Sequence, residues 1–113
     1  MIDPNALATY FGGDTALLRK FAGVFAREAP GVVSLLDEAM ASGDLPAVAL
    51  HAHTLKSQIR YFGYADLADR LQEIEQLAEG RTVPEPLAAL VAAFNRDFHA
   101  VYREVAALGG TGE

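Results

Sequence analysis

The segment from Leu45 to Phe62, LPAVALHAHTLKSQIRYF, decides the fold of this protein. Its apolar residues recur at intervals of three, four, three, four and three: Leu45, Val48, Ala52, Leu55, Ile59 and Phe62. This spacing keeps one face of a helix apolar, whereas a half-buried strand would alternate apolar and polar residues. The segment therefore predicts an amphipathic helix that starts after Asp44, its N-cap, and is interrupted at Gly63.

Two further helices are expected ahead of this segment. Asp3, followed by proline, is typical of a helix start, and Gly12 and the glycine after it stop that short helix. Asp14 caps the next helix, which continues to Gly43. Its apolar stripe consists of Leu17, Leu18, Phe21, Phe25, Val32, Val33, Leu36 and Met40. Because proline lacks a backbone N–H, we expect a kink or a break immediately before Pro30.

Two more helices are expected after Gly63. The first carries an apolar stripe and ends at Gly80; the stripe is Leu67, Leu71, Ile74 and Ala78. A loop over Arg81–Glu85 follows, and the last helix starts around Pro84 or Pro86 and ends at Gly109. Its stripe is Leu87, Leu90, Val91, Phe94, Phe98, Val101, Tyr102, Val105 and Leu108. Phe21, Phe25, Phe94 and Phe98 are expected in the core.

Four long helices with one apolar face each, joined by short turns, pack most simply as an antiparallel bundle. The predicted fold is thus all-α, an antiparallel four-helix bundle with a short additional N-terminal helix. The chain has 113 residues, of which 51% are hydrophobic. That is enough for one core and too short for two, so residues 1–113 are expected to form a single domain.

Composition excludes several kinds of function. The chain has no cysteine, which rules out disulfides, thiolate metal sites and cysteine nucleophiles. A formal net charge of -6 disfavours nucleic-acid binding, which depends on clustered Lys and Arg. We find no signal peptide and no apolar stretch near the ~20 residues that span a bilayer, so we expect a cytoplasmic monomer without membrane contact. No motif for a metal or a cofactor is present.

One polar face of the central helix carries candidate chemistry. A helix advances about 100° per residue, so Lys56, Ser57 and Arg60 all fall within about 60° of His53. The apolar stripe lies on the opposite side of the helix. We therefore expect the His53 imidazole on the solvent side, with the small residue Ala49 one turn before it leaving the ring accessible.

The sequence around His53 resembles the histidine phosphotransfer (HPt) family. The matching residues are Ala52-His53-Thr54-Leu55-Lys56, then Gly63 ten residues after the histidine, then Leu67, Leu71, Ile74 and Glu75. The resemblance is specific over Ala52–Glu75 and weaker elsewhere. It implies a four-helix bundle with an exposed, phosphorylated histidine. It also implies receiver domains of response regulators or hybrid histidine kinases as partners that supply or take the phosphoryl group, with a partner kinase as the alternative donor. It implies no cofactor and no kinase activity in this chain.

The resemblance also implies a role for each matched residue. His53 is the expected phosphoacceptor, since neutral imidazole has a ring nitrogen that can attack an aspartyl phosphate. Lys56 is expected to place a cation beside the phosphoryl oxygens. Arg60 is a candidate partner for acidic groups around a receiver's phosphorylation site. Glu75 either hydrogen-bonds the imidazole and orients it or is an ordinary surface carboxylate.

Ser57 departs from the family pattern, which has glycine directly after the lysine. The serine is either tolerated or alters phosphotransfer. It also leaves open a second function, an HPt-like binding module that docks on a kinase or a receiver without being phosphorylated. A third possibility, the dimerisation domain of a histidine kinase, is disfavoured because its usual motif after the histidine is missing.

The other histidines are weaker candidates. His51 lies about 200° around the helix from His53, so it is expected at the edge of the buried side. For the same reason the two do not form a metal clamp, which requires a spacing of three or four residues on a helix. His99 falls outside the apolar stripe of the last helix and is expected at the surface.

Overall fold

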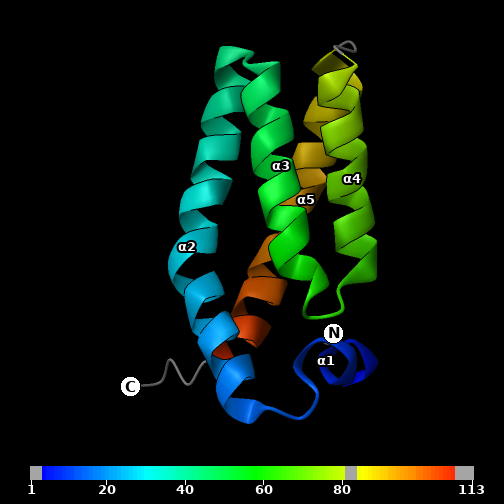
Figure 1. Ribbon diagram of the computed structural model, residues 1–113. Coiled ribbons are helices and arrows are strands. Elements are labelled where there is room, and N and C mark those ends of the chain that lie inside the picture. The colour runs from blue at the N-terminus through cyan, green and yellow to red at the C-terminus, as the bar shows by residue number, and fades with distance from the viewer. Residues whose placement is uncertain (1–3, 81–83, 109–113) are drawn as a thin grey trace.

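A computed structural model describes residues 4–80 and 84–108 of the chain (Figure 1). These residues form α1 (Pro4–Phe11), α2 (Thr15–Ser42), α3 (Leu45–Arg60), α4 (Ala65–Glu79) and α5 (Pro84–Leu108). No strand occurs in either range. The predicted all-α fold is confirmed. None of the helices described combines the length and the apolar character that crossing a bilayer requires.

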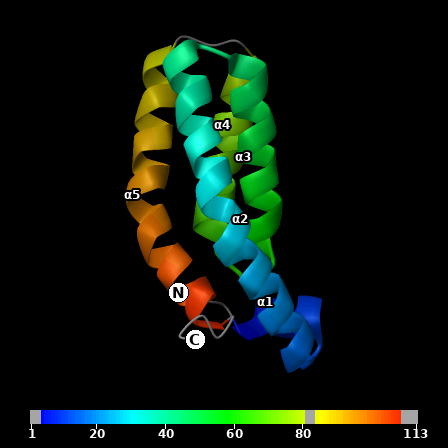
Figure 2. The ribbon, with the colours of Figure 1, turned by 90° about the vertical axis from the view of Figure 1, so that its left-hand side faces the viewer.

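The four long helices form the sides of a bundle. α3 packs most extensively against α4, and the other sides are α2 with α3, α2 with α5, and α4 with α5. Of the extents of 43 × 27 × 20 Å, the longest matches the length of α2, since 28 helical residues span about 42 Å. The short α1 lies across the end of the bundle where α3 gives way to α4, as the two ribbon views agree (Figures 1 and 2).

α2 and α3 start after the predicted N-caps Asp14 and Asp44, and α2 ends at the predicted Gly43. The Asp14 carboxylate accepts a hydrogen bond from the Leu17 N–H at 3.0 Å, and the Asp44 carboxylate accepts one from the Ala47 N–H at 3.2 Å. Each satisfies a backbone donor that the first helical turn leaves unpaired. At the other end of α2, Gly43 has a φ of 73°, a left-handed conformation that glycine adopts without strain.

Of the kink or break predicted before Pro30, the break is absent, and the kink stays a prediction. α2 is continuous from Thr15 to Ser42 with Pro30 inside it. A proline in a helix interior costs about 3 kcal/mol, because one hydrogen bond is lost and the ring crowds the preceding turn. Phe25, Ala29 and Leu36 are almost fully buried on either side of the proline. Their packing holds both halves of α2 on the bundle and offsets that cost.

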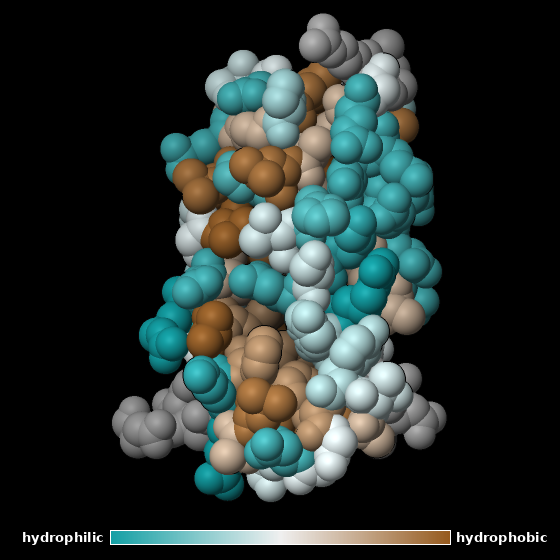
Figure 3. Space-filling model, in the orientation of Figure 1, coloured by the Kyte–Doolittle hydropathy of each residue, from teal (hydrophilic) through white to brown (hydrophobic). Residues whose placement is uncertain are grey.

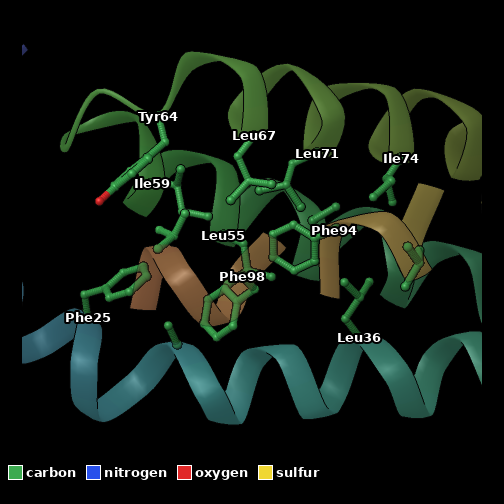
Figure 4. Packing of buried hydrophobic residues seen from close by; sticks show 14 of the residues in the cluster. Phe25, Leu36, Leu55, Ile59, Tyr64, Leu67, Leu71, Ile74, Phe94 and Phe98 are labelled. Carbon is green, nitrogen blue, oxygen red and sulfur yellow. The ribbon is translucent and has the colours of Figure 1, made fainter. Parts of the chain in front are cut away.

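The core contains side chains from all five helices. Among the largest buried side chains are Phe25, Leu36, Leu55, Ile59, Leu71, Ile74 and Phe94 (Figure 4). Three of the four phenylalanines expected in the core are buried, but Phe21 is 40% exposed. Its ring contacts those of Phe11 of α1 and Tyr61, at centroid distances of 5.6 and 5.7 Å.

Element boundaries differ slightly from the sequence prediction. α3 ends at Arg60, so Phe62 lies in the turn, yet its side chain is still buried at 2% exposure. α5 starts at Pro84, the earlier of its two predicted starts. The expected N-cap Asp3 lies outside the described residues.

Two tyrosines attach α5 to the rest of the bundle. The Tyr102 hydroxyl donates to the carbonyl of Ala26 at 3.1 Å, and the Tyr64 hydroxyl donates to Glu104 Oε1 at 2.6 Å. Burial and the neighbouring carboxylate raise the pKa of Tyr64, and the hydrogen bond from Tyr64 lowers the pKa of Glu104. The tyrosine therefore remains a donor and the glutamate a charged acceptor.

Candidate functional site

His53 lies in the middle of α3 on the face turned away from the core. Its side chain is 58% exposed, while its neighbours Ala52 and Leu55 have no exposed surface. Ala49, one turn before it, is nearly buried and presents only a methyl group. The imidazole is thus accessible to a macromolecular partner.

Glu75 reaches this imidazole from α4. Its carboxylate oxygens lie 3.3 and 3.2 Å from His53 Nδ1, and its side chain is only 14% exposed. Burial alone would raise the pKa of this carboxyl group. Hydrogen bonds from Lys56 and His53 outweigh burial, so the pKa of Glu75 lies below its ordinary value. Glu75 is therefore a carboxylate at neutral pH, not an ordinary surface residue.

This contact defines the tautomer of a neutral His53. A carboxylate only accepts hydrogen bonds, so the ring nitrogen that faces it, Nδ1, carries the proton. The lone pair of the neutral ring is then on Nε2. Glu75 thereby leaves the lone pair on Nε2 of an exposed ring.

Lys56 does not lie where the helical face suggests. Its side chain is only 10% exposed, and its ammonium group donates to Glu75 Oε1 at 2.8 Å and to Gln72 Oε1. Lys56 is therefore not a solvated surface lysine, and its role beside the phosphoryl oxygens stays a prediction. The long side chain turns toward α4 because two acceptors lie there, whereas helix geometry fixes only the direction of its Cβ.

Ser57 and Arg60 lie on the exposed face but do not join this network. The Ser57 hydroxyl donates to the backbone carbonyl of His53 at 3.2 Å, so it bonds the helix and not the ring. Arg60 is exposed. With Ser57, Tyr10 of α1 and Tyr61 it lines a shallow cleft of about 190 Å³ beside the histidine face.

Gln72 was missed by the sequence analysis. It lies three residues before Glu75, so both side chains lie on the same face of α4. The spacing of three residues could have indicated that Gln72 lies beside Glu75. A glutamine at the flank of an apolar stripe, however, is typical of a solvated position. Only the packing of α3 against α4 brings it to Lys56.

The remaining histidines lie as expected. His51 is half-buried at the edge of α3, and His99 is exposed on α5. Nowhere in residues 4–80 and 84–108 do three His, Asp or Glu side chains gather in a group that could hold a metal ion.

Hydrophilic and large apolar side chains are unevenly distributed over the exposed surface. Hydrophilic side chains gather over α4 (Figure 3), where the exposed residues include Asp66, Asp69, Glu73, Gln76 and Glu79. Large apolar side chains are exposed on the other elements: Tyr10, Leu17, Phe21, Leu35, Leu50 and Tyr61. Three of these, Tyr10, Phe21 and Tyr61, form a cluster of contacting rings at the α1 end.

Comparison with protein families identifies the family of this chain. The family model of the Hpt domain matches residues 20–110, which include α3 and α4. Searches of curated proteins and of solved structures gave no significant match. The matched range covers most of the chain and includes the exposed histidine and its carboxylate partner. This protein belongs to the Hpt domain family, whose members carry out histidine phosphotransfer in two-component signalling.

Proposed function

We propose that this protein is a phosphorelay intermediate that accepts a phosphoryl group on Nε2 of His53 from a receiver-domain aspartate and passes it to a response regulator. The observation that carries the proposal is the pairing of His53 Nδ1 with the Glu75 carboxylate on a ring that is 58% exposed. In this proposal the phosphoryl group comes from a partner protein, and the chain has no kinase activity of its own.

The proposed step needs no proton transfer at the reacting nitrogen. The Nε2 lone pair attacks phosphorus, a nitrogen–phosphorus bond forms, and the bond from phosphorus to the aspartate oxygen breaks with its electron pair staying on the aspartate. The ring then bears a positive charge, because Nδ1 keeps its proton. The Glu75 carboxylate stabilises that charge, and transfer to the next receiver reverses the same bonds.

Lys56 acts in this proposal mainly through Glu75. Its ammonium already donates to two acceptors, which hold it toward α4 and leave one of its three donors for an incoming phosphoryl group. Its charge nevertheless lies beside the site and favours the anionic transition state. Lys56 thus combines a structural contact with an electrostatic contribution to transfer.

We infer that the receiver covers His53 from the α1 side. A receiver's phosphorylation site is rich in carboxylates, and α4 presents acidic side chains that would repel it. Arg60 offers the opposite charge, and the adjoining rings of Tyr10 and Tyr61 are 45% and 39% exposed. Aromatic and arginine side chains are the residue types enriched at protein interfaces.

The test is a transfer assay with purified components. The protein is incubated with a receiver phosphorylated on its aspartate, and the product is examined for a phosphate that is labile in acid and stable in base. We expect labelling of the wild type and none of His53→Gln. Receiver binding without labelling of the wild type would overturn the proposal in favour of a non-phosphorylated binding module.

A further inference from the structure

Gln72 occupies one corner of a four-residue arrangement between α3 and α4. His53 and Lys56 lie three residues apart on α3, and Glu75 and Gln72 lie three residues apart on α4 in the opposite chain direction. His53 faces Glu75, Lys56 faces Gln72, and Lys56 Nζ also reaches Glu75 Oε1 at 2.8 Å. Glu75 therefore binds both residues of α3.

We propose that Gln72 is a positioning residue for His53: its side-chain carbonyl holds the Lys56 ammonium against Glu75, which keeps the Glu75 carboxylate oriented on His53 Nδ1. The inference that this positioning serves phosphotransfer rests on the proposed function. The contacts that carry it concern the unphosphorylated protein.

The need for a second acceptor follows from the chemistry of lysine. An ammonium group has three donors on a flexible stem, and a largely buried one is stable only if it is paired. Glu75 Oε1 alone would fix one direction and leave Lys56 free to turn outward. Gln72, one turn along α4, supplies a second fixed acceptor and so limits the ammonium to the position between the two side chains.

Neutrality makes glutamine suited to this place. An amide oxygen accepts the hydrogen bond without adding a second negative charge beside Lys56. Glu75 is then the one anion with which the ammonium is paired in this arrangement, and it remains ionised opposite the imidazole. Gln72 thus acts on His53 indirectly: it holds Lys56, and Lys56 holds the Glu75 carboxylate that binds the imidazole.

The test measures the ring of His53 directly. Gln72→Met removes the acceptor and keeps a side chain of similar length, and Gln76→Met, at an exposed position one turn further along α4, is the matched control. The ¹⁵N shifts of the two ring nitrogens, recorded where the imidazole is neutral, give the ratio of the tautomers. Circular dichroism verifies that each variant is folded.

We expect Gln72→Met to lower the proportion of the Nδ1–H tautomer and to slow transfer from a phosphorylated receiver by roughly three- to tenfold. We expect a smaller loss than the roughly 10- to 100-fold seen when a residue that hydrogen-bonds a metal-ligating histidine is mutated, because His53 is exposed. Gln76→Met should match the wild type in both measurements. Gln72→Glu keeps an oxygen acceptor but adds a negative charge beside Lys56, so its tautomer ratio should lie between those of Gln72→Met and the wild type.

An unchanged tautomer ratio in Gln72→Met would overturn the inference, as would Gln72→Glu behaving like Gln72→Met. If Gln72→Met fails to fold, Gln72→Ala is measured in its place with the same expected result. The tautomer ratio needs no phosphate, so this test remains decisive even if the wild type takes up no phosphoryl group.

Discussion

Lys56 and His53 lie one turn apart on α3 and bind the same carboxylate oxygen, Oε1 of Glu75, at 2.8 and 3.3 Å. A change to either residue therefore alters the environment of the other. Mutational effects on transfer and on stability at these positions should be coupled, whereas those at Ser57 and Arg60 should be independent of them.

His53→Gln should abolish phosphorylation and leave helicity and melting temperature nearly unchanged, because an exposed side chain adds little to stability. Labelling by a phosphorylated receiver and thermal unfolding measure the two effects. His51→Gln is the matched control, and it should keep its labelling. Full labelling of His53→Gln would refute the assignment of the phosphoacceptor.

Glu75→Gln should slow transfer, because an amide stabilises the charged phosphoimidazole less well than a carboxylate. It should also change the pH dependence of stability. Since the pKa of Glu75 is lowered in the folded state, its contribution is complete above its ordinary value of 4.5 and is lost as the pH falls through the lower folded value. The difference in unfolding free energy between wild type and Glu75→Gln should therefore shrink on acidification below pH 4.5. A constant difference down to strongly acidic pH would contradict this.

Lys56→Met should slow transfer without eliminating it, since the lysine is not the nucleophile. It should also destabilise the protein by about 1 to 3 kcal/mol, because Glu75 and Gln72 lose their donor in a largely buried place. Denaturant unfolding measures this change. A variant with wild-type stability would show that the buried contacts of Lys56 contribute nothing.

Ser57→Gly and Ser57→Ala should both transfer at least as fast as the wild type, since the hydroxyl bonds the His53 carbonyl and not its ring. Glycine in a helix interior costs roughly 0.5 to 1 kcal/mol, so the first variant should be slightly less stable, and the second should not. Stopped-flow transfer rates and melting curves separate the effects. Slower transfer in both variants would make the hydroxyl part of the site.

Arg60→Ala should weaken binding of the receiver about two- to fivefold at low salt and less at high salt, as an exposed charge contact does. Arg103→Ala, an exposed arginine on α5, serves as the control and should leave affinity unchanged. Titration at two ionic strengths gives the comparison. Equal losses in the two variants would indicate a general charge effect and not a contact beside His53.

Most of the fold could be predicted from local sequence. Asp14 and Asp44 cap their helices through side chains that reach three residues ahead, which depends on nothing outside the turn. The outward direction of His53 likewise follows from the helical period. A break before Pro30 was predicted but does not occur, because the packing that keeps α2 continuous across the proline comes from other helices.

The features of the candidate site likewise separate into those set within one segment and those set by packing between helices. The sequence by itself determined the helices, the apolar face of each, and an exposed histidine in the HPt pattern, because these depend on spacing within one segment. Only the tertiary structure decided that Lys56 is buried, that Gln72 binds it, that Glu75 is shared, and that Phe21 stays exposed. Each of these depends on which side chains a neighbouring helix brings within a few ångströms, and the register of α3 against α4 is set by the packing of the whole core.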